Sequence, residues 1–220
     1  MDLYDAEIAT NDAAFGELLD LLARRKLLED TVIVFVSDHG EEFLDHGGWE
    51  HGKTLHDEML DVPLIVRVPG LARGRTVEQQ VQQADVAPTI LDLLGLPPTP
   101  GQEGRSRLRE MMGQEPPSAD PAESATFSWL EESGLRAAAV TTPRWRLIEK
   151  RFPIPGRYLY DRQADPDEHH DLSRERPVRT GFLREQLRIA ERPRKGMLRA
   201  GEAAVGPEVA RQLKALGYLH

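Results

Sequence analysis

The sequence predicts an α/β protein with a small antiparallel sheet near the end of the chain. Two short apolar runs, residues 31–36 and 62–68, alternate with helical patterns, and such alternation is typical of a sheet covered by helices. Later apolar runs are short and interrupted by prolines, as expected of antiparallel strands. We therefore place an α/β core in residues 1–115 and a small α+β subdomain in residues 116–220.

The core begins with an amphipathic helix, predicted for residues 6–28. Its apolar residues recur at three-, four- and seven-residue intervals, at Ile8, Phe15, Leu18, Leu19 and Leu22. The run TVIVFV that follows, residues 31–36, is continuously apolar and rich in β-branched side chains. Continuous apolarity favours a strand covered on both faces, as in a parallel sheet between helix layers.

A second strand of this type is predicted at residues 62–68, and residues 85–95 predict a helix that ends at Gly95. Residues 101–125 are rich in Gly, Pro, Ser and charge, which indicates a surface connection. The expected elements beyond it are strands at 135–140, 145–148 and 158–160, a turn at 161–171, polar helices and a tail at 212–219.

Composition excludes several kinds of partner and site. The net charge of −9, with no run of Lys and Arg, argues against a nucleic-acid partner. The absence of cysteine excludes disulfides and thiolate metal sites, but it leaves the compartment open. The acidic start does not resemble a signal peptide, and no apolar run is long enough to span a bilayer. We expect a soluble chain of unknown localisation.

Residues with chemical potential are concentrated in SDHGEEFLDHGGWEHGK, residues 37–53. Asp38 and His39 stand at the carboxyl end of the first strand, where ligands bind in parallel sheets, and Gly40 permits a sharp turn. A carboxylate and a neutral imidazole can share one divalent cation, although two ligands form only half of a metal site. Lys53 and His51 can converge on an anionic group held there. The pattern suggests ester hydrolysis at sulfur or phosphorus.

Each of these residues also has a purely structural interpretation. The Asp38-His39 pair can be a helix cap beside a surface histidine, and Lys53 can be a solvated lysine. For several other residues we prefer the structural interpretation. These are His46 and His56 as surface or packing residues, Glu41-Glu42 as turn residues, Asp165 to Glu168 as a capped turn rather than a calcium loop, and His169-His170 as exposed.

Five blocks in order resemble the C-terminal half of sulfatases in the alkaline phosphatase superfamily, over nearly the whole chain. They are Tyr4-Asp5-Ala6-Glu7-Ile8 with Asp12; Thr31 to Gly40; His51-Gly52-Lys53-Thr54-Leu55 with Glu58 and Val62-Pro63-Leu64-Ile65; Asp85 to Leu91 with Gly95-Leu96-Pro97 and Gly104-Arg105-Ser106; and Tyr158-Leu159-Tyr160-Asp161 with Asp165-Pro166, Glu168 and Asp171-Leu172. The tail is like that of many bacterial members. The resemblance implies a partial alkaline phosphatase-like α/β/α sandwich.

The resemblance also implies roles for the candidate residues. Asp38 and His39 would supply part of a divalent metal site, Lys53 would neutralise charge on the bound ester, and His51 would contact substrate or leaving group. The family commonly uses calcium, and His39, where many sulfatases have asparagine, also suits manganese or zinc. The implied substrate is a small-molecule or glycan sulfate ester.

The chain departs from the family at the nucleophile. Sulfatases carry a formylglycine, made from Cys or Ser in a Cys/Ser-x-Pro-x-Arg motif of their first half, and this sequence contains no such motif. We therefore expect a truncated sulfatase, inactive alone, whose partner is the missing N-terminal half. Two alternatives stay open: a phosphoester or phosphonate hydrolase or phosphoryl-group transferase of the same superfamily, and a non-catalytic remnant or interaction protein. In a truncated sulfatase, the strands of the first half are missing, and the exposed edges or faces around residues 32–36 would be an aggregation hazard.

Overall fold

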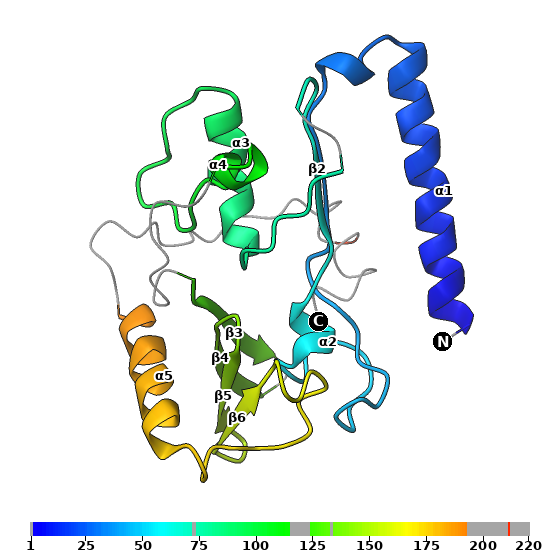
Figure 1. Ribbon diagram of the computed structural model, residues 1–220. Helices are drawn as coiled ribbons and strands as arrows, with labels where there is room; N and C mark the ends of the chain where they lie inside the picture. Colours follow the sequence, from blue (N-terminus) through cyan, green and yellow to red (C-terminus); the bar gives the residue numbers. More distant parts are fainter. Residues whose placement is uncertain (1, 72–73, 115–123, 133, 193–210, 212–220) are drawn as a thin grey trace.

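The computed structural model describes residues 2–71, 74–114, 124–132, 134–192 and 211. Two parts follow one another along the chain (Figure 1). The first contains α1 (Asp2–Arg24), β1 (Ile33–Val36), α2 (Asp57–Leu60), β2 (Leu64–Arg67), α3 (Val86–Leu93) and α4 (Leu108–Met111), with 3-10 turns at Leu28–Asp30 and Gln83–Asp85. The second contains β3 (Thr126–Glu132), β4 (Leu135–Thr141), β5 (Trp145–Phe152), β6 (Gly156–Asp161) and α5 (Pro177–Ala190).

The predicted first helix is confirmed as α1, which begins and ends four residues earlier than expected. One member of its apolar stripe contacts β1, where the ring of Phe15 lies 5.3 Å from that of Phe35, measured between centroids. Two other members of the stripe, Ile8 and Leu18, remain about half exposed, at 53% and 47%. The helix is therefore only partly covered in this structure.

Strands β1 and β2 form a two-stranded antiparallel sheet, with Val34 opposite Val66 and Phe35 opposite Ile65. Both strands were predicted, but the parallel pairing and two-sided cover expected of the first were not found. Phe35 is 41% exposed and Ile65 is 63% exposed. The continuous apolar run reflects a tendency to be buried, and it carries no information on the direction of the neighbouring strand.

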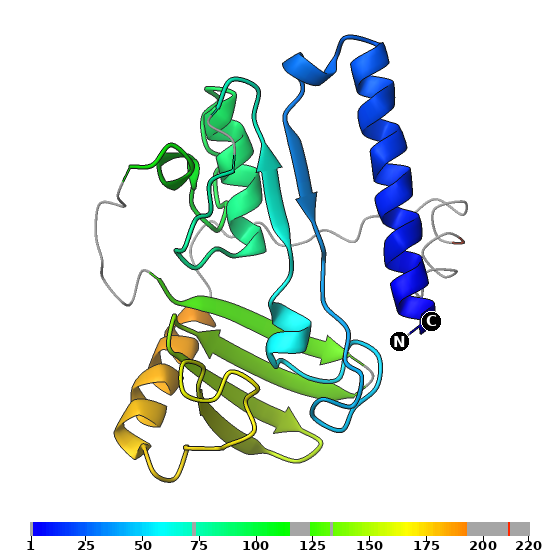
Figure 2. The ribbon, with the colours of Figure 1, turned by 45° about the vertical axis from the view of Figure 1, so that its right-hand side comes forward.

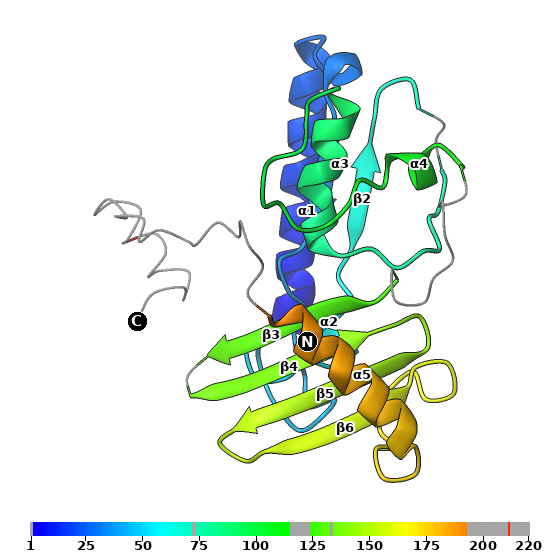
Figure 3. The same cartoon turned by 90° about the vertical axis from the view of Figure 1, so that its left-hand side faces the viewer.

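The predicted antiparallel sheet is confirmed and is larger than expected. Its order is β3-β4-β5-β6, and β3 was not anticipated from the sequence. Alternate residues point to opposite faces: Ala138, Val140 and Leu147 pack with α5, which crosses one face in Figure 3. On the other face, Ala139, Ile148 and Tyr160 pack with Leu55, which belongs to the segment between β1 and β2.

The connecting segments follow the sequence predictions in part. Helix α3 ends at Leu93, and Gly95 takes the positive φ of 66° that a helix C-terminus favours. The 101–125 connection contains α4, while the tail at 212–219 lies outside the described residues. No helix in the described part of the chain is long and apolar enough to cross a membrane. The boundary at residue 115 stays a prediction.

Candidate active site

The backbone after β1 is held in a turn that presents Asp38 and His39. The Gln83 side-chain amide donates to the carbonyl oxygens of Ser37 and Asp38, both at 2.7 Å. The Gly40 amide donates to the Met59 carbonyl at 3.0 Å, and a Cβ at position 40 would overlap the Glu58 carbonyl. Only glycine fits there, so Gly40 is required by the close approach of the chain leading into β2.

Asp38 and His39 are arranged as half of a cation site would be. Nδ1 of His39 lies 2.8 Å from the Gly40 carbonyl oxygen, an acceptor, so this nitrogen carries the hydrogen. The other nitrogen, Nε2, is then left with its lone pair and faces Asp38 Oδ1 at 3.9 Å. A histidine that binds a metal is usually fixed in this way, with its second nitrogen bonded to a carbonyl or carboxylate. The two side chains therefore fit a divalent cation.

His51 joins this pair through its ring. It stacks on His39 with centroids 4.4 Å apart, and its Nδ1 lies 3.5 Å from Glu41 Oε2. The other oxygen of Glu41 is buried and has no hydrogen-bond partner among the described residues. Glu41 was interpreted from the sequence as a turn residue; an acidic residue five positions after a strand gave no stronger signal. The structure thus groups Asp38, His39 and His51 and adds Glu41.

Lys53 lies on the same loop but points its ammonium group elsewhere. Its Nζ donates to the Trp49 carbonyl at 2.5 Å and lies 3.7 Å from Glu50 Oε2. The side chain is 47% exposed. Lys53 is therefore near the other candidates in the chain, while its charge is directed at the loop backbone in this structure.

The loop between His39 and Lys53 is organised by one buried carboxylate. Oε1 of Glu42, a residue only 1% exposed, accepts hydrogen bonds from the amides of His46 at 3.0 Å and Gly48 at 2.7 Å. Phe43 and Trp49 close the turn with a backbone bridge and ring centroids 5.4 Å apart. In Figure 2 the segment after β1 reaches down to the four-stranded sheet.

The residues given structural interpretations behave largely as predicted. Asp165 caps its turn by accepting from the His170 amide at 2.7 Å, and His170 is 82% exposed. No group of three or more side chains in the described residues is placed to hold a metal ion. His56 is buried, at 4% exposed, and Glu168, at 1%, is its partner rather than a surface turn residue.

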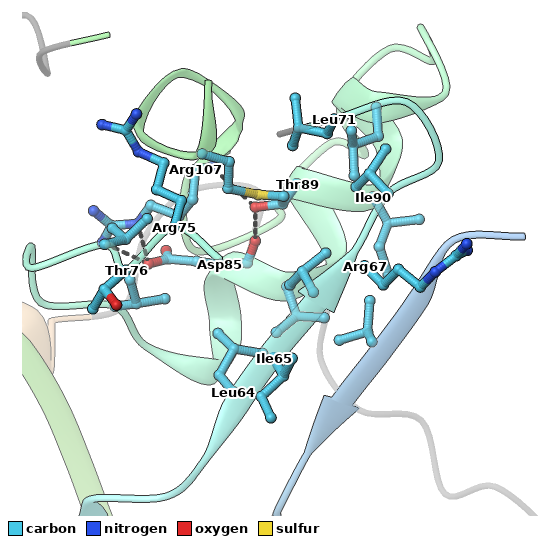
Figure 4. A pocket seen from close by; sticks show the side chains of 18 of the residues that line it. Leu64, Ile65, Arg67, Leu71, Arg75, Thr76, Asp85, Thr89, Ile90 and Arg107 are labelled. Carbon is cyan, nitrogen blue, oxygen red and sulfur yellow. Dashed lines mark hydrogen bonds and ion pairs between the residues drawn. The ribbon is translucent and has the colours of Figure 1, made fainter. Parts of the chain in front are cut away.

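A cavity of about 690 Å³ lies between β2 and α3, away from these residues (Figure 4). Its walls are mainly apolar, with Leu64 and Ile90 facing it, and none of Asp38, His39, His51 and Lys53 lines it. Two of the charged groups at its edge are paired with each other, because Arg107 Nε donates to Asp85 Oδ2 at 2.7 Å. We regard it as packing space between two elements and place the candidate site at the end of β1.

Comparisons with known proteins show a likeness to sulfatases. The family model described as Sulfatase matches residues 1–96. Arylsulfatase K of Gallus gallus is 32% identical over 172 residues, which are 75% of this chain and 32% of that protein. N-acetylglucosamine-6-O-sulfatase of Bacteroides thetaiotaomicron is 29% identical over 174 residues, 77% of this chain and 31% of that protein. The chain spans about a third of the length of the curated relatives it matches.

Solved structures give the same answer for the fold. The phosphonate monoester hydrolase of Agrobacterium radiobacter superposes with a TM-score of 0.70 at 25% identity, covering 83% of this chain and 39% of that one. A protein solved with its substrate D-glucosamine-2-N,6-O-disulfate gives 0.67 at 24% identity, covering 84% and 38%. Taken together, the family match over residues 1–96, the sequence relatives and the solved structures agree in the chain's likeness to sulfatases of the alkaline phosphatase superfamily.

Proposed function

We propose that this chain forms part of a divalent-metal-dependent hydrolase of sulfate esters. The observation that carries the proposal is the orientation of His39, whose Nδ1 is bonded to the Gly40 carbonyl so that Nε2 faces the Asp38 carboxylate. Calcium is the first candidate for the cation, with manganese and zinc as alternatives that imidazole also suits. When bound, the cation would polarise the ester oxygens and offset their charge.

The other candidate residues act around that pair. His51 lies against His39 with a carboxylate of Glu41 beside its Nδ1, which orients the ring and leaves Nε2 to exchange a proton with a leaving group. The Lys53 ammonium is held only by one backbone carbonyl and an exposed ion pair with Glu50, so it can turn toward an anionic ester. There it would offset the negative charge of the ester and its transition state.

The substrate class rests on the relatives. The name of the Bacteroides thetaiotaomicron relative specifies a 6-O-sulfated amino sugar, which favours a glycan sulfate ester. The second candidate, phosphonate monoester hydrolysis, is favoured by the likeness to two solved phosphonate monoester hydrolases, at 25% and 26% identity. An imidazole at position 39 is compatible with either chemistry.

We infer that turnover requires a part of the enzyme beyond this chain. The sequence has neither a cysteine nor a Ser-x-Pro-x-Arg motif that would supply the formylglycine. The half-exposed apolar residues of α1, β1 and β2 offer a surface for that part, and Leu18, Phe35 and Ile65 are 47%, 41% and 63% exposed. Its proposed partner is the N-terminal portion of a sulfatase fold.

The test is a comparison of esters on the full-length protein that contains this chain. We expect aryl sulfate hydrolysis to exceed hydrolysis of an aryl phosphonate monoester, and Asp38→Ala or Lys53→Ala to lower the rate by roughly 10² or more, as loss of charge stabilisation does. The exposed His170→Ala is the matched control and should leave the rate unchanged. Faster phosphonate hydrolysis would favour the second candidate, and full activity of Asp38→Ala would exclude the proposed metal pair.

A further inference from the structure

A second pair of histidines, His46 and His56, lies at the two ends of the loop formed by residues 47–55. The rings of His46 and His56 stack with centroids 3.7 Å apart and planes within 5° of parallel. Residues 47–55 between them carry His51 and Lys53. The stacked pair therefore brings together the ends of the loop that presents both of these side chains.

Both ring nitrogens of His46 face acceptors. Nδ1 lies 2.9 Å from Glu58 Oε1, and Nε2 lies 3.2 Å from the backbone carbonyl oxygen of Glu168. A neutral imidazole has one N–H and can donate only once, whereas an imidazolium donates from both nitrogens. His56 differs, because one proton on Nδ1 satisfies its bond to Glu168 Oε2 at 2.9 Å. The geometry therefore requires a His46 ring that is protonated on both nitrogens, stacked on a His56 ring for which one N–H is enough.

Charges from the neighbouring elements favour the proton on His46. Four carboxylates meet here against two guanidinium groups; they are Asp57, Glu58, Asp61 and Glu168 against Arg146 and Arg162. His169 also approaches, with its ring centroid 5.3 Å from that of His46. Burial on its own would lower the pKa of His46, but the hydrogen bond and charge of Glu58 and the carbonyl and charge of Glu168 outweigh it, so the pKa is raised.

The cluster is anchored in the four-stranded sheet. Arg146 of β5 is 1% exposed, its Nη1 lies 3.0 Å from Glu168 Oε1 and also pairs with Asp57, and its Nε donates to Thr141 of β4 at 2.9 Å. Glu168 in turn bonds His56, while its carbonyl receives His46. The loop ends are therefore joined to the most deeply buried part of the second sheet.

We propose that His46 is a positioning residue that, as an imidazolium between Glu58 and Glu168, closes the 47–55 loop and holds His51 and Lys53 over the sheet. The inference rests on the loop geometry and does not depend on which ester is hydrolysed. The pKa of His46 in the folded chain lies above its unfolded value of about 6.5. The stabilisation that its positive charge gives to the closed loop is therefore complete below that pH. It is lost as the pH rises through the folded pKa, so the loop loosens toward alkaline pH.

The test measures protonation and loop opening on the 220-residue chain without any activity assay. Ring ¹⁵N chemical shifts should show two N–H nitrogens on His46 at pH 6.5 and a titration above that pH. Hydrogen exchange of residues 47–55, corrected for intrinsic rates, should become about tenfold faster relative to β5 between pH 6 and pH 9. Failure of the proposed ester chemistry would not alter either readout.

Matched variants separate positioning from general stability. His46→Gln should abolish the pH dependence of exchange, Glu58→Gln should lower the pKa of His46 while the fold is kept, and the exposed His170→Gln should change neither. A single N–H on His46 at pH 6.5, or loop protection that does not change with pH, would overturn the proposal. The wild-type titration decides the question even if His46→Gln does not fold.

Discussion

The two sheets of this protein differ in how completely they are covered. All buried apolar residues of the described chain lie in the four-stranded sheet, in α5 or in the Leu55 and Met59 segment that reaches them. Val140, Leu147 and Leu159 have no exposed surface, whereas Phe35 of β1 and Ile65 of β2 keep 41% and 63% of theirs. The four-stranded sheet has a core on each of its faces, whereas apolar residues of the two-stranded sheet remain partly exposed.

The contrast explains where the candidate site is rigid. Asp38 and His39 follow the poorly covered strand β1, but the loop after them is bonded to the well-packed sheet through Glu168 and Arg146. The candidate site is therefore held firmly on the side of the four-stranded sheet and is poorly covered on the side of β1. Three substitutions test this comparison, beginning with the largest expected effect.

Arg146→Met should produce the largest loss of stability. It removes the guanidinium group that lies 3.0 Å from the buried Glu168, while Asp57 keeps its pair with Arg162. Breaking a buried pair on one side costs about 3–5 kcal/mol. Urea unfolding followed by tryptophan fluorescence, to which Trp129 of β3 and Trp145 of β5 contribute, measures the change. Arg188→Met, which removes an exposed pair with Glu185, is the control and should leave the midpoint in place. Equal midpoints for the two variants would contradict the anchoring role of Arg146.

Leu147→Ala should be nearly as damaging and tests the core directly. Leu147 is fully buried between the sheet and α5, and truncation of a buried leucine costs about 2–5 kcal/mol. The matched change in the other part is Leu18→Ala on α1, where 47% of the side chain is exposed. Its cost should stay below about 1 kcal/mol in the same urea experiment. If both leucines cost the same, the proposed difference between the two parts does not exist.

Ile65→Thr should have the smallest effect on stability and a larger effect on association. The side chain is 63% exposed on β2, so the free energy of unfolding should change by about 0.5 kcal/mol or less. Threonine keeps the β-branched shape but removes apolar surface from a two-stranded sheet with open edges. Light scattering should show less self-association of the isolated chain. Unchanged scattering would mean that the surface responsible for self-association does not include Ile65.

The sequence alone determined the local elements and the family resemblance. Helical periodicity predicted α1, the TVIVFV run predicted β1, and the ordered blocks from Tyr4 to Leu172 resemble those of sulfatases. These features depend on neighbouring residues, whose side-chain pattern is set by the periods of helix and strand. The metal roles of Asp38 and His39 and the catalytic roles of His51 and Lys53 remain predictions.

Tertiary structure alone decided how distant segments meet. His56 and Glu168 are 112 positions apart, and neither residue type signals a buried pair when it is read along the chain. The antiparallel pairing of β1 with β2, the inclusion of β3 and the proximity of Glu41 to His51 were also invisible to local patterns. The buried side chains of Glu168, Arg146 and His56 are paired with groups from distant segments, so their burial is a property of the folded chain.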